Sequence, residues 1–277
     1  MTMNKLSKEE QVRVVACLVE GNSLRATVRM TGVHRTTIQK LLVELGAACS
    51  EYQDKAFRNL KCKRIQCDEI WSFIGCKEKN ATPEKKAHGY GDVWTWTAMD
   101  SESKLVPCWL VGNRDASVAY HFMHDLAGRL ANRVQMTTDG HKPYLSAVED
   151  AFGADIDYAM LIKLYGNAPE GGEVRYSPAK CMGARKTVVS GKPEHQHIST
   201  SHIERQNLTM RMSMRRFTRL TNAFSKKLEN HEAAIALHYM YYNFARVHQT
   251  LRVTPAMEAG VAIHVWSIRE IVDLLPS

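Results

Sequence analysis

The sequence lacks any run approaching eighteen apolar residues, which excludes an ordinary membrane-spanning helix. Its first residues, MTMNKLSKEEQ, mix acidic and basic side chains and contain no hydrophobic segment of the kind found in secretory signal peptides. We therefore expect no membrane partner, and a cytoplasmic protein is the default expectation.

The sequence also lacks a C-x-x-C pair, although it contains seven cysteines. Cys62 and Cys67 are the closest pair, and no second Cys or His pair follows at the spacing of a structural zinc site. We interpret the cysteines as reduced and mostly buried thiols. A zinc site built on Cys62 and Cys67 is the weaker alternative.

Acidic side chains are scarce in one basic stretch. The chain has a net charge of +8, with 44% hydrophobic and 24% charged residues, which is typical of a globular protein with at least one full core. Between His202 and Lys227, Glu204 is the only acid among seven basic residues: Arg205, Arg211, Arg215, Arg216, Arg219, Lys226 and Lys227. A solvated helix face usually mixes both signs, so this stretch predicts contact with phosphates.

The N-terminal fifty residues have the pattern of three short helices. Ser7 and Glu10 form a capping box, and Ser23 can cap a second helix. Gly32 provides a turn before a third helix over about 34–48. Helix, tight turn and helix is the spacing of a helix-turn-helix, whose later helix reads DNA.

Exposed residues near the start of the third helix can reach phosphates and base edges. We expect these to be Arg35, Thr36, Thr37, Gln39 and Lys40. A plain three-helix bundle with no role in DNA binding is the alternative interpretation.

The pattern changes to strands near Arg64. We predict strands over Arg64–Ile74, Val93–Met99, Leu105–Val111, Val134–Thr138 and Asp157–Tyr165, with helices over Ser117–Leu130, Tyr144–Phe152, Glu204–Arg216 and about Ser225–Phe244. This order is that of an RNase H-like domain.

The predicted fold class is α/β, an RNase H-like mixed sheet flanked by helices, with an N-terminal all-α domain. We place a helix-turn-helix domain at residues 1–50, a linker or linking helix at 51–63, the RNase H-like domain at 64–260 and a C-terminal tail at 261–277. A stretch rich in Gly, Pro and Lys, about 166–199, has no clear period and reads as an insertion that is functional or mobile.

Three acids fall on predicted elements that meet at one sheet edge. Asp68 lies in the first strand, Asp139 ends the fourth, and Glu204 lies on the basic helix. Converging carboxylates repel one another without a cation, so we predict that they bind two Mg²⁺ ions, with Mn²⁺ as a substitute. Taken singly, each acid also fits a structural role, such as a turn at Asp139 and Gly140.

Other polar residues are better explained structurally. We expect a cap or hydrogen bond for His141 and a turn for Asp100. His195 and His197 form an H-x-H pair, which we interpret as part of a loop without a metal.

Three segments carry a family resemblance: CDEIWSFIG around Asp68, TTDGHKPY around Asp139 and HIERQNLTMRMSMRR around Glu204. Together they resemble the DDE transposases of bacterial insertion sequences, most closely the IS-one family, over most of residues 64–260. In that family a basic residue follows the glutamate by seven positions, and Arg211 has that place here.

The resemblance implies an RNase H-like core, a divalent metal and recognition of terminal inverted repeats by the N-terminal domain. It makes Asp68, Asp139 and Glu204 the metal ligands and Arg211 a contact to DNA, with Arg215 on the same basic stretch. The chain departs from the compact members in the long separation between Asp139 and Glu204, which the 166–199 stretch supplies.

These patterns predict a transposase that binds double-stranded element ends and target DNA, cleaves them with metal and transfers strands. It would act in the bacterial cytoplasm, at the nucleoid, as at least a dimer because an element has two ends. Two alternatives stay open: a non-catalytic DNA-binding regulator, and a structure-specific RNase H-like nuclease.

Overall fold

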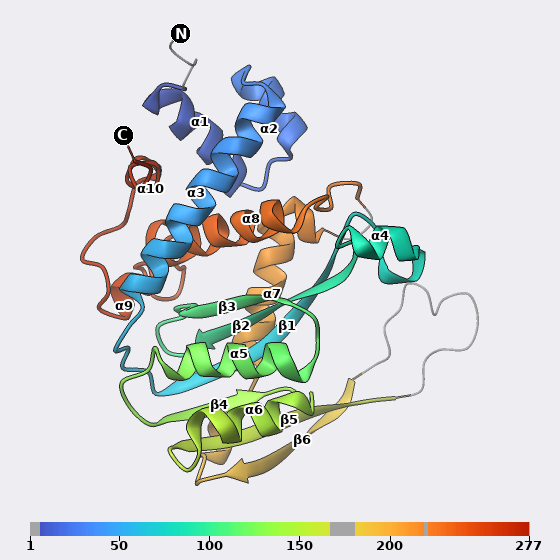
Figure 1. Cartoon of the computed structure of the whole chain (residues 1–277). Coiled ribbons are helices and arrows are strands. Elements are labelled where there is room, and N and C mark those ends of the chain that lie inside the picture. Colours follow the sequence, from blue (N-terminus) through green and yellow to red (C-terminus); the bar gives the residue numbers. More distant parts are fainter. Residues whose placement is uncertain (1–5, 167–180, 219–220, 277) are drawn as a thin grey trace.

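A mixed sheet with helices on both faces forms the body of the molecule, and three N-terminal helices stand against one end of it (Figure 1). The computed structural model describes residues 6–166, 181–218 and 221–276. Across these ranges, no helix is both long enough and apolar enough to cross a membrane.

Six strands form the sheet in the order β3-β2-β1-β4-β5-β6. Their bounds are β1 Arg64–Ile74, β2 Gly91–Asp100, β3 Cys108–Gly112, β4 Val134–Thr138, β5 Ile156–Tyr165 and β6 Cys181–Ser190. β4 pairs in parallel with β1 and β5, whereas the pairs β1–β2, β2–β3 and β5–β6 are antiparallel. The predicted bounds of the first and fourth strands are confirmed, and the other three predicted strands shift by a few residues.

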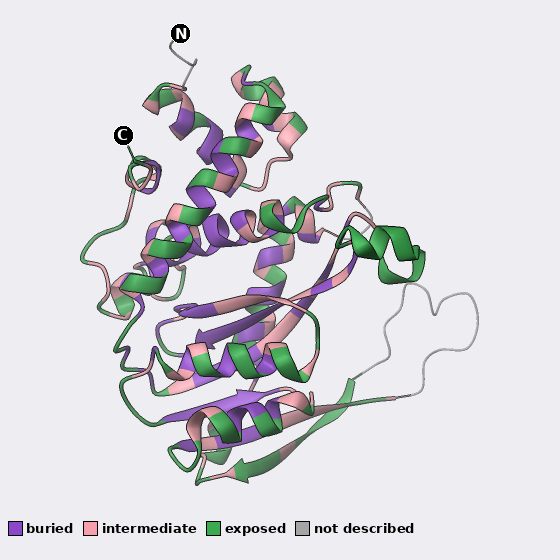
Figure 2. Cartoon of the chain, in the orientation of Figure 1, coloured by how far each residue is buried: buried purple, intermediate pink, exposed green. Residues whose placement is uncertain are grey.

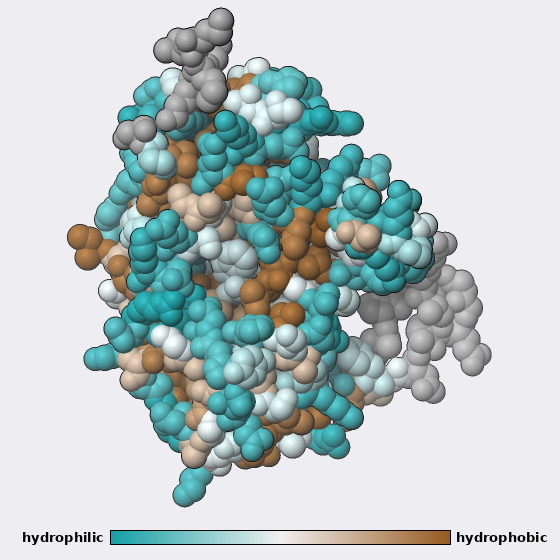
Figure 3. Space-filling model, in the orientation of Figure 1, coloured by the Kyte–Doolittle hydropathy of each residue, from teal (hydrophilic) through white to brown (hydrophobic). Residues whose placement is uncertain are grey.

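Helices cover the two faces of the sheet. α5 (Ala116–Ala127) and α6 (Pro143–Phe152) pack on one face, and α7 (Ser201–Ser213) and α8 (Leu228–Met240) lie on the other. The outward sides of α5 and α6 are exposed while the central strands are buried (Figure 2). On the face seen in Figure 3, hydrophobic side chains gather between the N-terminal helices and α5.

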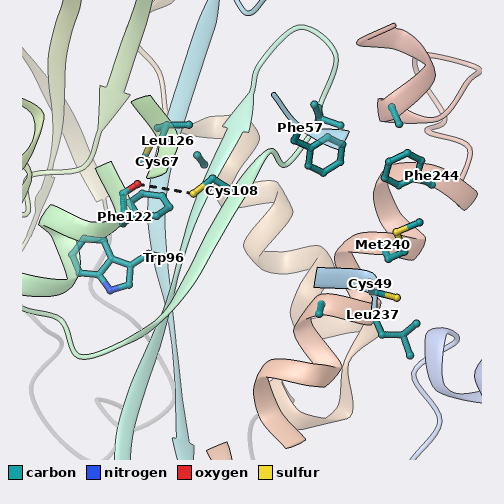
Figure 4. Close-up of a cluster of buried hydrophobic side chains, with 14 of the residues drawn as sticks. Cys49, Phe57, Cys67, Trp96, Cys108, Phe122, Leu126, Leu237, Met240 and Phe244 are labelled. Carbon is teal, nitrogen blue, oxygen red and sulfur yellow. Dashed lines mark hydrogen bonds between the residues drawn. The ribbon is translucent and has the colours of Figure 1, made fainter. Parts of the chain in front are cut away.

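Successive side chains of β1 point to opposite faces of the sheet, so this strand contributes to both hydrophobic clusters. Ile65 and Cys67 join the cluster that includes Phe122 of α5, whereas Ile70 joins a second cluster with Ile203 and other residues of α7 and α8. Figure 4 shows Trp96, Phe122 and Cys108 of the first cluster packed beside the sheet. The face of β1 that carries Ile70 is therefore the face that α7 covers.

The three predicted N-terminal helices are present as α1 (Lys8–Val19), α2 (Leu24–Thr31) and α3 (Arg35–Ala56). The Ser7 capping box with Glu10 and the Ser23 cap are both confirmed. Gly32 ends α2 with φ at 74°, a left-handed conformation that favours glycine.

α3 runs to Ala56, so the prediction that the third helix ends near Ala48 is wrong and the expected linker at 51–63 begins inside the helix. The physical reason is continued packing. Cys49 and Gln53 are buried, and Gln53 Nε2 donates a hydrogen bond to Ala236 O of α8 at 3.1 Å. The helix persists because its inward face still has a partner.

α3 crosses α8 at very short range. A Cβ added at Gly46 would lie 2.5 Å from Ala233 Cα, so the two backbones approach more closely than any larger residue permits. Beside the crossing, Cys49 and Phe57 of the α3 region lie against Leu237, Met240 and Phe244 of the α8 region (Figure 4). This seam fixes the N-terminal helices to the sheet domain.

The predicted insertion at about 166–199 contains β6, which was not predicted. β6 pairs with β5 at the edge of the sheet, and its side chains are exposed on both faces. Exposure on both faces removes the alternation of apolar residues that identifies a strand in a sequence. Residues 167–180, like Arg219 of the basic stretch, lie outside the described residues.

The predicted C-terminal tail at 261–277 contains α10 (Ile268–Val272), which packs against α1. Ile271 and Val272 are buried, and Lys8 Nζ lies 3.1 Å from Asp273 Oδ1. The segment is therefore part of the N-terminal unit in space.

Short elements complete the chain. They are α4 Pro83–Ala87, α9 Pro255–Glu258, the 3-10 turns Glu78–Asn80, His195–His197 and Arg215–Phe217, and a π-helical turn Tyr241–Ala245. The helix predicted over about Ser225–Phe244 is thus a shorter α8 followed by this π-helical turn.

Candidate metal centre

Asp68 and Asp139 lie side by side on adjacent parallel strands. The register pairs Cys67 of β1 with Thr138 of β4, and each aspartate is the next residue along its strand. Asp139 Oδ1 accepts a hydrogen bond from His141 N at 2.9 Å, which fixes the turn after β4. The structure therefore brings together two of the three acids predicted from the sequence.

Glu69 is the third acid in this cluster, in place of the predicted Glu204. Oxygen atoms of Asp68, Glu69 and Asp139 lie within 4.8 Å of one another, a spacing that can hold a metal ion. Sequence reasoning missed Glu69 because neighbouring residues of a strand point to opposite faces. Its position directly beside Asp68 was the available signal.

An arginine neutralises part of the cluster. Arg114 lies between β3 and α5, with Nε 3.0 Å from Glu69 Oε2 and Nη2 3.3 Å from Asp139 Oδ2. Nothing in the sequence pattern marked Arg114, because it comes from a loop whose path depends on the folded sheet.

The acids destabilise one another's charged forms. Burial, followed by the charges of Glu69 and Asp139, raises the pKa of Asp68 to about 7. Burial and Asp139 likewise raise the pKa of Glu69, while Tyr144 and Arg114 oppose the shift. The buried hydroxyl of Tyr144 lies beside the Glu69 carboxylate, so Tyr144 and Arg114 are the groups that face it.

Glu204 faces the same site from α7 but is held by other residues. Glu204 Oε2 lies 2.5 Å from Lys163 Nζ of β5, and its Oε1 accepts a hydrogen bond from the Thr200 hydroxyl at 2.6 Å. Its charge also contributes to the raised pKa of Asp68. One turn further along α7, Asn207 Nδ2 donates to Asp68 Oδ2 at 2.8 Å. Glu204 is therefore near the aspartates and outside the tight cluster.

β1 itself caps α7. Thr200 is the N-cap residue of this helix, but its side chain makes no capping bond. Gln66 Oε1 accepts the amides of His202 and Ile203 instead, at 3.0 and 3.1 Å. A long-range glutamine cap cannot be read from local sequence, and it anchors α7 two residues from Asp68.

The residues predicted to bind DNA divide into two groups. Arg35 and Gln39 of α3 and Arg215 after α7 line one cavity of about 590 Å³. The others do not line it: Thr36, Thr37, Lys40 and Arg211. Of these, Lys40 is exposed with its Nζ 3.9 Å from Glu44 Oε1, and Arg211 is half-buried.

Asp100 takes the turn role predicted for it, whereas the Nε2 of His141 is buried without a described hydrogen-bond partner. Asp100 Oδ2 accepts the amide and hydroxyl of Ser103 in the turn after β2. Cys62 and Cys67 are buried free thiols, and the metal-spaced group found in the described chain does not include them or the His195–His197 turn.

Three half-buried carboxylates, two in the middle of β1 and one directly after β4, lie close enough together to be a candidate divalent-metal site. Residues 183–245 match the family model described as IS1 transposase. The predicted resemblance is thereby confirmed over this segment, which includes α7, α8, Glu204 and Arg211 and leaves out Asp68 and Asp139. The match supports a transposase.

Comparison with curated proteins finds none that matches this sequence. Among solved structures, the chain is similar to one described as a cryo-EM structure of piggyBac transposase synaptic complex with hairpin DNA. The TM-score is 0.46 at 9% identity, with 99% of this chain and 72% of that chain covered. Those values are too low to transfer properties to this chain.

Proposed function

We propose that the chain is a DNA transposase that uses an RNase H-like, metal-dependent site to cleave element ends and transfer strands. The observation that carries the proposal is the IS1 transposase match over the segment that contains Glu204 and Arg211. In the fold, the helix of that segment packs on the strand that bears Asp68.

The sheet supports an RNase H-like assignment of residues 64–260. Three antiparallel strands come first in the chain, and the next two strands lie parallel to the first, each preceded by a helix. This is the order that the sequence predicts. The additional β6 extends the far edge without disturbing the pair of strands that carries Asp68 and Asp139.

The residues present fit a divalent cation. Three carboxylates converge, and the pKa of Asp68 is raised by burial and by the charges of Glu69 and Asp139, which is a penalty that a bound cation would relieve. Asp68 and Asp139 would hold Mg²⁺ or Mn²⁺, with Glu69 within reach and Glu204 completing the set after leaving Lys163. A bound divalent ion there polarises a phosphate oxygen and activates a bound water or hydroxyl.

The protein's own residues have further parts in this proposal. Arg114 and Lys163 form ion pairs with carboxylates of the site, and both side chains would be free to contact phosphate oxygens if a cation took their place. His141 adjoins Asp139, and burial and Arg114 lower its pKa, so its imidazole is neutral near pH 7. Asn207 holds the carboxylate of Asp68 in one orientation.

DNA binding is assigned to residues 1–50 and to the basic stretch after Glu204, with a linker at 51–63 that includes the end of α3. The proposed contacts lie at the start of α3 and at the end of α7: Arg35, Thr36, Thr37, Gln39 and Lys40, with Arg211 in the last turn of α7 and Arg215 just after it. Acting on two element ends requires at least a dimer. We expect binding to weaken with salt, by about 0.9 in log K per phosphate contact per decade.

The test uses duplexes taken from the DNA on either side of the gene, incubated with the full chain and Mg²⁺, Mn²⁺ or EDTA. Metal-dependent nicking followed by joining of the new 3′ ends to a second duplex supports a transposase. Cleavage without joining indicates a nuclease. Binding that persists in EDTA, with no cleavage product under either metal, indicates a non-catalytic regulator and contradicts the proposal.

A further inference from the structure

A cavity of about 590 Å³ lies where the N-terminal helices meet the end of α7 and the face of α8. Gly21, in the turn between α1 and α2, closes one wall against Ser213. A Cβ at Gly21 would lie 2.7 Å from Ser213 O, and its φ of +76° is one that glycine adopts without strain. The cavity is therefore built jointly by the two parts of the chain.

The charge lining this cavity is of one sign. Among the described residues, no acidic side chain lines it and five basic ones do: Arg25, Arg35, Arg215, Arg216 and Lys226. Within residues 6–166, 181–218 and 221–276, none of the five lies within ion-pair distance of a carboxylate. A second cavity of about 530 Å³ is lined by Asp54, Glu229 and Glu232 as well as Arg129, so the excess of positive charge is specific to the first. Cations that share one hollow repel one another, and a bound anion relieves that repulsion.

Arg216 is the most constrained of these cations. Burial lowers its pKa to about 10, and no acid counteracts that shift. Arg216 Nη1 donates to Ser225 Oγ at 2.9 Å, and Ser225 Oγ is 2.8 Å from His231 Nδ1. His231 Nε2 in turn lies 3.1 Å from Ser72 Oγ of β1. This buried chain fixes one corner of the guanidinium, which has five N–H donors in all.

The remaining walls suit the uncharged part of a ligand. Phe224 and Leu42 contribute apolar surface, and His238 lines the cavity with its Nε2 buried and without a described hydrogen-bond partner. Burial also lowers the pKa of His238 to about 3, so the ring is neutral and can donate or accept a single hydrogen bond there. A basic rim beside an apolar wall with one unused polar atom matches a nucleotide better than a simple ion.

We propose that this cavity binds one nucleotide, with its phosphate on Arg216, Arg215 and Lys226 and its base against the apolar wall. The volume lies in the range of about 300–1,000 Å³ typical of small-molecule sites. The chemistry is shared by two sources, a nucleotide of bound DNA and a free nucleotide. The inference rests on the proposed function only for the choice of DNA as the source.

The first experiment compares the full chain with Arg216→Gln and, as the rim variant, Lys226→Gln. Arg13→Gln is the matched control, because Arg13 is exposed on α1 and does not line the cavity. Binding of labelled duplex is measured over a salt series. We expect each cavity variant to bind the duplex about tenfold more weakly and to lower the slope of log K against log salt by about 0.9. Arg13→Gln should bind with the affinity and salt slope of the wild type.

The second arm measures the melting temperature with deoxyadenosine monophosphate or inorganic phosphate. Stabilisation of the wild type by the nucleotide, lost in Arg216→Gln and Lys226→Gln, supports the site and identifies free nucleotide as a source. A lowered DNA salt slope without nucleotide stabilisation supports the site with DNA as the source. Lys226→Gln keeps the test valid if Arg216→Gln does not fold.

The inference is overturned if folded variants match the wild type both in DNA salt slope and in response to nucleotide. Failure of the proposed function looks different. In that case the wild type neither cleaves nor joins DNA, while the nucleotide still stabilises it through Arg216 and Lys226.

Discussion

Asp68 carries the strongest electrostatic signal at the scale of single residues. Its carboxyl is buried beside Glu69 and Asp139, which raises its pKa in the folded chain to about 7 from an ordinary value of 3.8. Well below pH 4 it is protonated in both the folded and the unfolded chain. As pH rises from about 4 to about 7, the unfolded chain has released this proton while the folded chain still holds it, so the folded state loses stability across this window.

Replacing Asp68 by Asn should therefore stabilise the metal-free protein at pH 8 by about 1–3 kcal/mol and have little effect at pH 4. Urea unfolding in EDTA at the two pH values measures this. Glu149→Gln, at an exposed position on α6, is the control and should show no such difference. An equal effect of Asp68→Asn at both pH values would contradict the assigned electrostatic origin.

Lys163 forms an ion pair with Glu204 that a metal ion bound by Glu204 would have to replace. Its ammonium group lies 2.5 Å from Glu204 Oε2, where it competes with a cation for that carboxylate. Lys163→Gln should strengthen Mn²⁺ binding several-fold, because it removes a positive charge that pairs with a carboxylate of the proposed site, and a neighbouring like charge costs a cation on the order of 1 kcal/mol even in high dielectric. Calorimetric titration measures the affinity, with the exposed Lys192→Gln as a control. Weaker Mn²⁺ binding in Lys163→Gln would mean that Lys163 supports the site.

The site residues that sequence patterns missed share one property. Glu69, Arg114, Lys163 and Asn207 act through contacts between elements that are distant in the chain. Asp68 and Asp139 were accessible to sequence reasoning because each ends or interrupts an apolar strand. The position of Glu204 was accessible too, but its ion pair with Lys163 depends on how β5 lies against α7.

At the scale of elements, the crossing of α3 and α8 depends on Gly46. Alanine in a helix interior is normally more stable than glycine by about 1 kcal/mol. Here a Cβ would overlap the backbone of Ala233, so the sign should reverse. We expect Gly46→Ala to destabilise the fold by about 1–3 kcal/mol.

Denaturant unfolding of Gly46→Ala, Ala233→Gly and the double variant measures this effect. Removing the Ala233 methyl opens space at the crossing, so the two changes should couple by about 0.5–3 kcal/mol. A stabilising Gly46→Ala would disprove the close approach of the two helices.

Elements with a strong period were predictable, and those that depend on distant partners were not. β1 and β4 have their predicted bounds because each is a buried strand delimited by polar residues. The end of α3 was missed because Gln53, a polar residue, is buried by its bond to α8. β6 was missed because both its faces are exposed.

At the scale of the whole molecule, the N-terminal helices and the sheet domain form one connected structure. α3 crosses α8, α10 packs on α1, and the turn at Gly21 meets Ser213. The two proposed DNA-contacting regions, at the start of α3 and after α7, consequently line one cavity. No local pattern predicted this, since the two regions lie far apart in the sequence.

The α10 contact has a testable consequence for this arrangement. Ile271 is fully buried, and Ile271→Ala should cost about 2–5 kcal/mol of stability. Hydrogen exchange should show a larger loss of amide protection in α1, which α10 covers, than in β4. Ile263→Ala, at a nearly fully exposed position, is the control. Equal loss of protection in α1 and β4 would mean that the molecule unfolds as one unit.

The most direct test of the central claim is the rate of metal-dependent cleavage and joining of the gene-flanking DNA by single-acid variants. Asp68→Asn, Asp139→Asn and Glu204→Gln should each reduce the rate on the order of 100-fold or more, while the exposed Glu149→Gln retains the wild-type rate. The rate of Glu69→Gln shows whether Glu69 takes part in the reaction in addition to Glu204. Near wild-type rates in folded Asp68→Asn, Asp139→Asn and Glu204→Gln would contradict the account.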